Sequence, residues 1–175
     1  MSARAAFALV CGAAALWCAL AAAPPLLEHA GHGAAAGWSR LPLALVCHQK
    51  PQRSFLLAER PMALCARCSG IAVGFLAGSL LVLGLSVARP GRAPAFPPRQ
   101  LLLIGVLPMG LQWGLTAAWI SKSLDGAALR AGTGALFGFV LAFYFLPAVA
   151  EMAGDLTRPR RAPQRGEAID AVPTA

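Results

Sequence analysis

The chain has 175 residues, enough for one compact domain, and 58% of them are hydrophobic. Charged residues make up only 13%, too few to cover the surface of a soluble domain, so the composition favours a membrane protein. The formal net charge of +8 does not indicate nucleic-acid binding, because the basic residues flank apolar runs and Tyr144 is the only tyrosine that could stack on bases.

Four apolar stretches reach the length of about 20 residues that a helix needs to cross a bilayer. In chain order they are residues 5–23, 61–88, 100–120 and 127–150. They predict an all-α fold, a polytopic helical membrane bundle of three or four transmembrane helices. The number depends on the first stretch, because Arg4, the alanine-rich run and the small residues before Pro24 also resemble a secretory signal with its cleavage site.

The prediction divides the chain into four parts. Residues 1–23 form a signal anchor or first transmembrane span, and residues 24–60 form an extracytoplasmic segment with a Cys-His-Gln motif. Residues 61–150 form a three-span helical bundle. Residues 151–175 are rich in proline, arginine and alanine without an apolar period, which predicts a disordered basic cytoplasmic tail.

Basic residues in the short connections predict the orientation. The connection 89–99 carries three arginines and no acid, and the tail carries four more arginines. In the opposite connection, residues 121–126, Lys122 is balanced by Asp125. Because positive charge in short loops favours the cytoplasmic side, we predict a multi-pass protein of the cell inner or plasma membrane with a cytoplasmic carboxyl terminus.

Small residues recur every four positions in three of the four stretches. The sets are Gly70, Gly74 and Gly78; Gly110, Gly114 and Ala118; and Gly134, Gly138 and Ala142. Small residues at this spacing share a helix face and let two backbones approach closely in lipid. We therefore predict a tight bundle whose partner is the lipid bilayer, with glycine-rich faces that could also contact another membrane protein or a second copy of the chain.

The candidate chemistry is concentrated between residues 47 and 70. Pro61 suits the first turn of a helix. Such a helix would place Cys65 and Cys68, three positions apart, on one face of its opening turns. The positive end of the helix dipole and the nearby Arg67 favour the thiolate forms of both cysteines.

Three chemistries fit the cysteines. Cys47, His48, Cys65 and Cys68 offer three sulfurs and one nitrogen, a common ligand set for tetrahedral zinc, so metal binding is the first hypothesis and zinc the first candidate cofactor. Adjacent ligands seldom both reach one ion, so a three-ligand site with an open position also fits. The cysteines could instead form a disulfide in an oxidising compartment, or act as the Cys-x-x-Cys pair of a membrane thiol–disulfide oxidoreductase.

A second polar set accompanies the cysteines: Arg53, Arg67, Gln112, Asp125 and Arg130. A charged residue in a span usually faces the bundle interior with a partner. Arg130 could therefore pair with Asp125 or Gln112, bind an anionic ligand beside the cysteines, or extend to water. These residues also allow a small transporter or an accessory subunit of one. Whether the protein is an enzyme stays open, because no H-E-x-x-H, G-x-S-x-G or phosphate-binding glycine loop occurs.

Three motifs together resemble a known family. Cys47 begins the pattern C-H-Q-x-P-x-R-S-F, Cys65 begins C-A-R-C-S-G, and Arg130 begins R-A-G-T-G before a glycine-rich span. Over about residues 45–150 the chain is similar to the prokaryotic predicted membrane proteins grouped as domain of unknown function 2085. The resemblance implies that the cysteine cluster is a shared feature, and it implies no activity. Family proteins often carry an acid and a glycine after the third-span proline, and the residues that follow Pro108 lack the acid.

Overall fold

The computed structural model describes residues 2–89, 96–117 and 125–157, and five helices and a hairpin lie in these ranges. The elements are α1 (Ala3–His29), α2 (Gly33–Ala44), a single 3-10 turn η1 (Pro51–Arg53), β1 (Ser54–Leu57), β2 (Arg60–Cys65), α3 (Ala66–Ala88), α4 (Gln100–Ala117) and α5 (Ala127–Thr157). By length and composition α1, α3, α4 and α5 can each cross a membrane. The predicted helical membrane bundle is confirmed, with four candidate spans.

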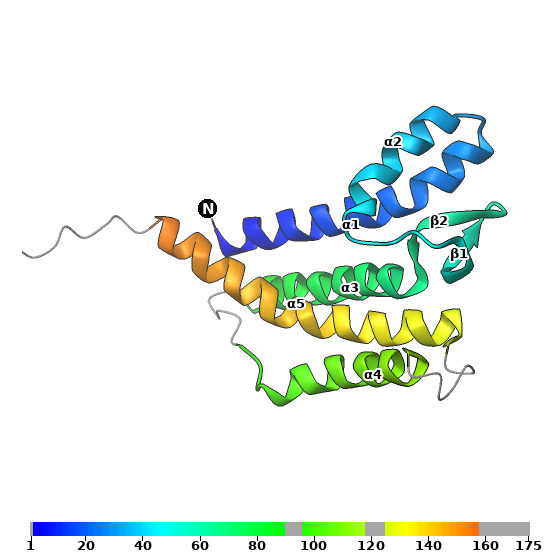
Figure 1. The fold of residues 1–175 in the computed structure, drawn as a ribbon. Helices are drawn as coiled ribbons and strands as arrows, with labels where there is room; N and C mark the ends of the chain where they lie inside the picture. The colour runs from blue at the N-terminus through cyan, green and yellow to red at the C-terminus, as the bar shows by residue number, and fades with distance from the viewer. Residues whose placement is uncertain (1, 90–95, 118–124, 158–175) are drawn as a thin grey trace, which may run out of the picture.

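The four long helices lie side by side, with α3 and α5 in the middle of the bundle (Figure 1). α1 packs mainly on α3, and α4 packs on α5. α2 and the hairpin lie at the end of the bundle where α3 begins (Figure 1). The chain start and the last turns of α5 lie together at the opposite end.

Glycines bring α3 and α5 into backbone contact. A Cβ atom added at Gly70 or Gly74 would overlap the carbonyl group of Ala131 or Ala135 in α5. In return, a Cβ atom at Gly138 would overlap the carbonyl group of Ile71 in α3. The predicted close packing is therefore confirmed for α3 and α5, whose small-residue faces pack against each other.

The third glycine face differs from its prediction. A Cβ atom added at Gly110 or at Gly114 of α4 would meet no atom within 4 Å. α4 instead approaches α5 through Gly105, where an added Cβ would lie 3.2 Å from Cβ of Val140. The four-residue spacing therefore misidentified the packed face of α4, because a small-residue stripe can also face open space. Pairing with a partner or a second copy stays a prediction.

An antiparallel hairpin replaces the predicted start of the second span. β1 pairs with β2 and Leu57 lies opposite Arg60. The two turn residues, Ala58 and Glu59, have φ values of 51° and 61°, as in tight hairpin turns. The prediction that Pro61 opens a helix is wrong, since Pro61 lies in β2 and α3 begins at Ala66. A proline fits there because each strand of a two-stranded sheet is an edge strand.

Two other boundaries differ from the predicted parts. α1 continues through Pro24 and Pro25 to His29, and the predicted extracytoplasmic segment begins inside it. α5 continues to Thr157, so the first residues of the predicted disordered tail are helical. The tail from residue 158 onward and Lys122 lie outside the described residues.

Candidate functional site

Three cysteine sulfurs converge at the end of the bundle where α3 begins. Cys47 follows α2, Cys65 is the residue before the first turn of α3, and Cys68 lies in that turn. Their Sγ atoms all lie within 4.8 Å of one another. The Cys65 N–H donates a hydrogen bond to the Cys47 Sγ at 3.3 Å. The three sulfurs form one group that could hold a metal ion or exchange a disulfide, and we call it the cysteine cluster.

The surroundings of the cysteine cluster are apolar on one side. Cys47 is 5% exposed, and it belongs to a buried group that also contains Ala21, Leu43, Ala63 and Leu64. This environment excludes water from one side of the sulfurs, which strengthens electrostatic interactions there.

The Cys65 thiol is acidic for a cysteine. Hydrogen bonding with the Cys68 side chain is the largest cause that lowers the pKa of Cys65, to about 5, and burial opposes it. The backbone of Cys68, the Cys47 side chain and the backbone of Arg67 lower it further. The low pKa of Cys65 therefore results from hydrogen bonds with neighbouring thiol groups and backbone amides. A thiolate at Cys65 is the form that binds metals and attacks disulfides.

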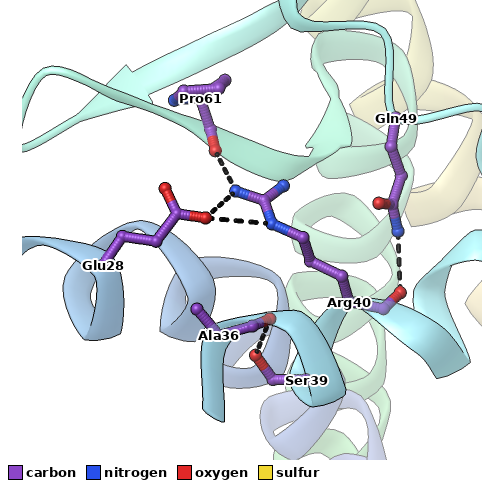
Figure 2. Close-up of polar contacts among 6 residues, drawn as sticks. All are labelled: Glu28, Ala36, Ser39, Arg40, Gln49 and Pro61. Carbon is purple, nitrogen blue, oxygen red and sulfur yellow. Dashed lines mark hydrogen bonds and ion pairs between the residues drawn. The ribbon is translucent and has the colours of Figure 1, made fainter. Parts of the chain in front are cut away.

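The chain segment that carries Cys47 is anchored by Arg40 of α2 (Figure 2). Arg40 Nη2 donates to Glu28 Oε1 at 2.9 Å and to the Pro61 carbonyl oxygen at 3.3 Å. Gln49 Nε2 donates to the Arg40 carbonyl oxygen at 2.8 Å. Gln49 has a positive φ of 49°, a strained conformation that this bond helps to hold. These contacts join α1, α2, β2 and the Cys-His-Gln motif to which Cys47 belongs.

Replacing Arg40 with glutamine should lower the free energy of unfolding by about 1 kcal/mol, because it removes a half-buried ion pair and a bond to the hairpin. Thermal unfolding of the detergent-purified protein would measure the loss. Arg60→Gln, at an exposed position of β2, removes the same charge as a matched control. An equal decrease in both variants would show that only net charge matters.

His48 lies apart from the cysteine cluster. It is exposed, and it is not among the residues whose ligand atoms meet there. The structure thus brings together three of the four predicted metal ligands, and the backbone turns the fourth toward solvent. Its role as a ligand stays a prediction.

Four of the five other predicted polar residues line a cavity that Cys65 also lines. The cavity has a volume of about 190 Å³ and is lined by polar and charged residues that include Arg53, Arg67, Asp125 and Arg130. Arg130 forms an ion pair with Asp125 and is 6% exposed. The hydrogen bond from Arg130 is the largest cause that lowers the pKa of Asp125, and the charges of Arg53 and Arg67 act in the same direction.

Gln112 is 4% exposed and accepts a hydrogen bond from Arg67 Nη2. The deep polar residue of α4 is therefore tied to the first turn of α3, beside the cysteine cluster. Cys68 lines a different cavity, of about 670 Å³, between apolar residues of α1, α3 and α5. The cysteine cluster consequently lies between a polar and an apolar cavity.

Some residues at the site were not predicted. Arg40, Glu28 and Gln49 hold the segment of Cys47, and Trp113 and Thr116 line the polar cavity. Gln49 could have been found, since it belongs to the Cys-His-Gln motif. The pairing of Glu28 with Arg40 depends on the fold of α2, which the alanine- and glycine-rich sequence did not indicate.

Comparison with known proteins gives a family and a relative. The profile of a family described as "predicted membrane protein", domain of unknown function 2085, matches residues 47–144, which include Cys47, Cys65, Cys68 and Arg130. An uncharacterized protein of Methanocaldococcus jannaschii is 35% identical over 109 residues, which cover 62% of this chain and 67% of that protein. No solved structure matches the chain. The chain therefore belongs to the domain of unknown function 2085 family of predicted membrane proteins.

Proposed function

We propose that this integral membrane protein binds a soft transition-metal ion, zinc first, through Cys47, Cys65 and Cys68. The observation that carries the proposal is the approach of three sulfurs from two chain segments to within 4.8 Å of one another. In a tetrahedral zinc site with bonds of about 2.3 Å, ligand sulfurs lie about 3.8 Å apart, so a small inward movement of the side chains would suffice.

The contacts around the sulfurs fit a metal site. The Cys65 N–H that donates to the Cys47 Sγ is the kind of outer contact that orients and tunes a ligating thiolate. Three sulfurs leave the fourth position open to water, to a small ligand, or to His48 after a local movement. An odd number of cysteines fits this arrangement better than a disulfide, which would leave one thiol over.

The orientation of the cluster is part of the proposal. Arg89 and Arg99 flank the helix ends opposite the cysteine cluster, at the carboxyl end of α3 and just before α4. Positive charge at that end supports a cytoplasmic location for it. The cysteine cluster would then face the extracytoplasmic side of the inner or plasma membrane, with the carboxyl terminus in the cytoplasm.

Metal analysis tests the proposal. Elemental mass spectrometry of the detergent-purified full chain should find about one equivalent of zinc, iron or copper, and a Cys65→Ser/Cys68→Ser variant should hold none. Thiol titration of the wild type should find the cluster cysteines reactive only after chelation. A metal-free protein whose cluster thiols appear only after reduction would contradict the proposal.

The close contact of Cys65 with Cys68 favours a second candidate, a membrane thiol–disulfide oxidoreductase. The Cys65 thiolate would attack a disulfide of a substrate protein and release one substrate thiolate, forming a mixed disulfide. Cys68 would then lose its proton and attack the Cys65 sulfur, releasing the second substrate thiolate. The two cysteines end oxidised and the substrate disulfide ends reduced. The outcome in which thiols appear only after reduction would favour this candidate.

A further inference from the structure

We propose that the cavity lined by Arg53, Arg67 and Arg130 binds a phosphate group or a similar tetrahedral oxyanion beside Cys65. The three arginines come from η1, α3 and α5, three elements that are separate in the chain. Their guanidinium groups lie around one carboxylate, that of Asp125, which leaves the cavity walls with a net charge of +2 before the Cys65 thiol is counted. We call this space the arginine cavity.

Within the part of the chain that the structure describes, one donor of this positive charge has no internal partner. Arg67 Nη2 bonds to Gln112, whereas Arg67 Nε is buried and has no hydrogen-bond partner among the described residues. A buried unsatisfied donor costs about 1–3 kcal/mol, more when it is charged. Arg67 lines the cavity, so a small shift of its guanidinium group would let a bound oxyanion accept a hydrogen bond from Nε. Arg130 is paired with Asp125, but a guanidinium has five N–H donors, more than a single carboxylate can satisfy.

The size and chemistry of the arginine cavity favour a small oxyanion. Its volume of about 190 Å³ is below the range of about 300–1,000 Å³ that is typical of pockets for drug-sized ligands, so it suits a small ion and not a large organic ligand. Planar guanidinium groups match the oxygens of phosphate with paired N–H bonds. The cavity also lies where α3 and α5 begin, and the positive ends of their dipoles add to the attraction for an anion.

The phosphate group could come from two sources. The arginine cavity lies at the ends of α3 and α5, and the ends of membrane-spanning helices lie near the lipid headgroups, so an anionic phospholipid could supply the group. Inorganic phosphate from the solution could supply the same chemistry. The proposal does not depend on metal binding by the cysteine cluster.

Binding should be measured on the full chain in a zwitterionic detergent by isothermal titration calorimetry with inorganic phosphate, at constant ionic strength set with chloride. Native mass spectrometry with added phosphatidylglycerol would measure whether an anionic phospholipid binds instead. The variants are Arg53→Gln, at an exposed position that should leave folding intact, and Arg67→Gln. Arg60→Gln, exposed on β2 and outside the cavity, is the matched control. Repeating the titration after chelation separates the arginine cavity from any phosphate bound to a metal ion.

We expect saturable binding that survives chelation, is weakened about tenfold or more in Arg53→Gln and Arg67→Gln, and is unchanged in Arg60→Gln. If phosphatidylglycerol shows this pattern and inorganic phosphate does not bind, the group belongs to a lipid headgroup. The proposal is overturned if neither ligand binds, if chelation abolishes binding, or if Arg60→Gln weakens binding as much as Arg53→Gln.

Discussion

Replacing Gly74 with alanine should lower the free energy of unfolding of the bundle by about 3 kcal/mol, the upper part of the range for overpacked cores. The added methyl group would overlap the carbonyl group of Ala135, which is backbone and cannot move away alone. α3 and α5 would have to separate along the interface that their glycines create. Thermal unfolding in detergent, followed by tryptophan fluorescence, would measure the change.

Two other glycines provide graded controls for Gly74. A Cβ atom at Gly84 of α3 would meet nothing within 4 Å, so Gly84→Ala should leave stability unchanged or slightly raised, because alanine is the better helix former. A Cβ atom at Gly105 would lie 3.2 Å from the Val140 side chain, which can shift, so Gly105→Ala should fall between the two. Similar unfolding temperatures for Gly74→Ala and Gly84→Ala would contradict the α3–α5 contact.

Separation of α3 from α5 should also disturb the polar end of the bundle. Gly70, one turn before Gly74, lies against Ala131, the neighbour of Arg130. Arg67 and Arg130 reach the same cavity from these two helices. The glycine contact therefore sets the distance between the arginines, and it connects the packing of the spans to the chemistry at their end.

The spans and the α3–α5 interface could be predicted from the sequence because membrane insertion depends on local composition. A run of about 20 apolar residues is enough to predict a membrane-spanning helix. Gly70 and Gly74 matched the spacing that brings helices together, and so did Gly110 and Gly114. Only the tertiary structure decides which of these faces meets another helix, so spacing alone could not separate α4 from α3.

The hairpin and α2 could not be predicted because their stability comes from tertiary contacts. The turn at Ala58 and Glu59 lacks the glycine or asparagine that marks positive φ, so the sequence carries no local signal for it. The weak helix α2 is held by the burial of Leu43 and by the ion pair of Arg40 with Glu28. In both elements, tertiary packing stabilises a conformation that the local sequence does not favour by itself.

The sequence could predict which residues belong to the candidate site, but it could not predict how they are arranged in space. The spacing of Cys65 and Cys68 indicates proximity by itself. The approach of Cys47 depends on the hairpin, which returns the chain to the start of α3. His48 is exposed, and the next residue, Gln49, has a positive φ; no sequence pattern indicated either feature.

Single substitutions in the cysteine cluster should each abolish tight metal binding. We expect Cys47→Ser, Cys65→Ser and Cys68→Ser to weaken zinc affinity about 100-fold or more, since a structural zinc site yields ~10–16 kcal/mol shared among its ligands. Competition with a chromophoric chelator would measure the affinities. Cys18→Ser removes a thiol from the middle of α1, outside the cysteine cluster, and should bind zinc as the wild type does.

His48→Ala decides whether the site has three protein ligands or four. Because His48 is exposed and lies outside the cysteine cluster, its loss should change zinc affinity less than about threefold, against about 100-fold for a cysteine ligand. An effect as large as that of Cys47→Ser would mean that metal binding reorganises the backbone at Gln49 and turns the imidazole inward. If the proposed zinc site has three sulfur ligands, its fourth position would be open, and an anion in the arginine cavity, which Cys65 also lines, could occupy it. Phosphate should then weaken chelator competition in the wild type, and Arg53→Gln should need about ten times more phosphate for the same effect.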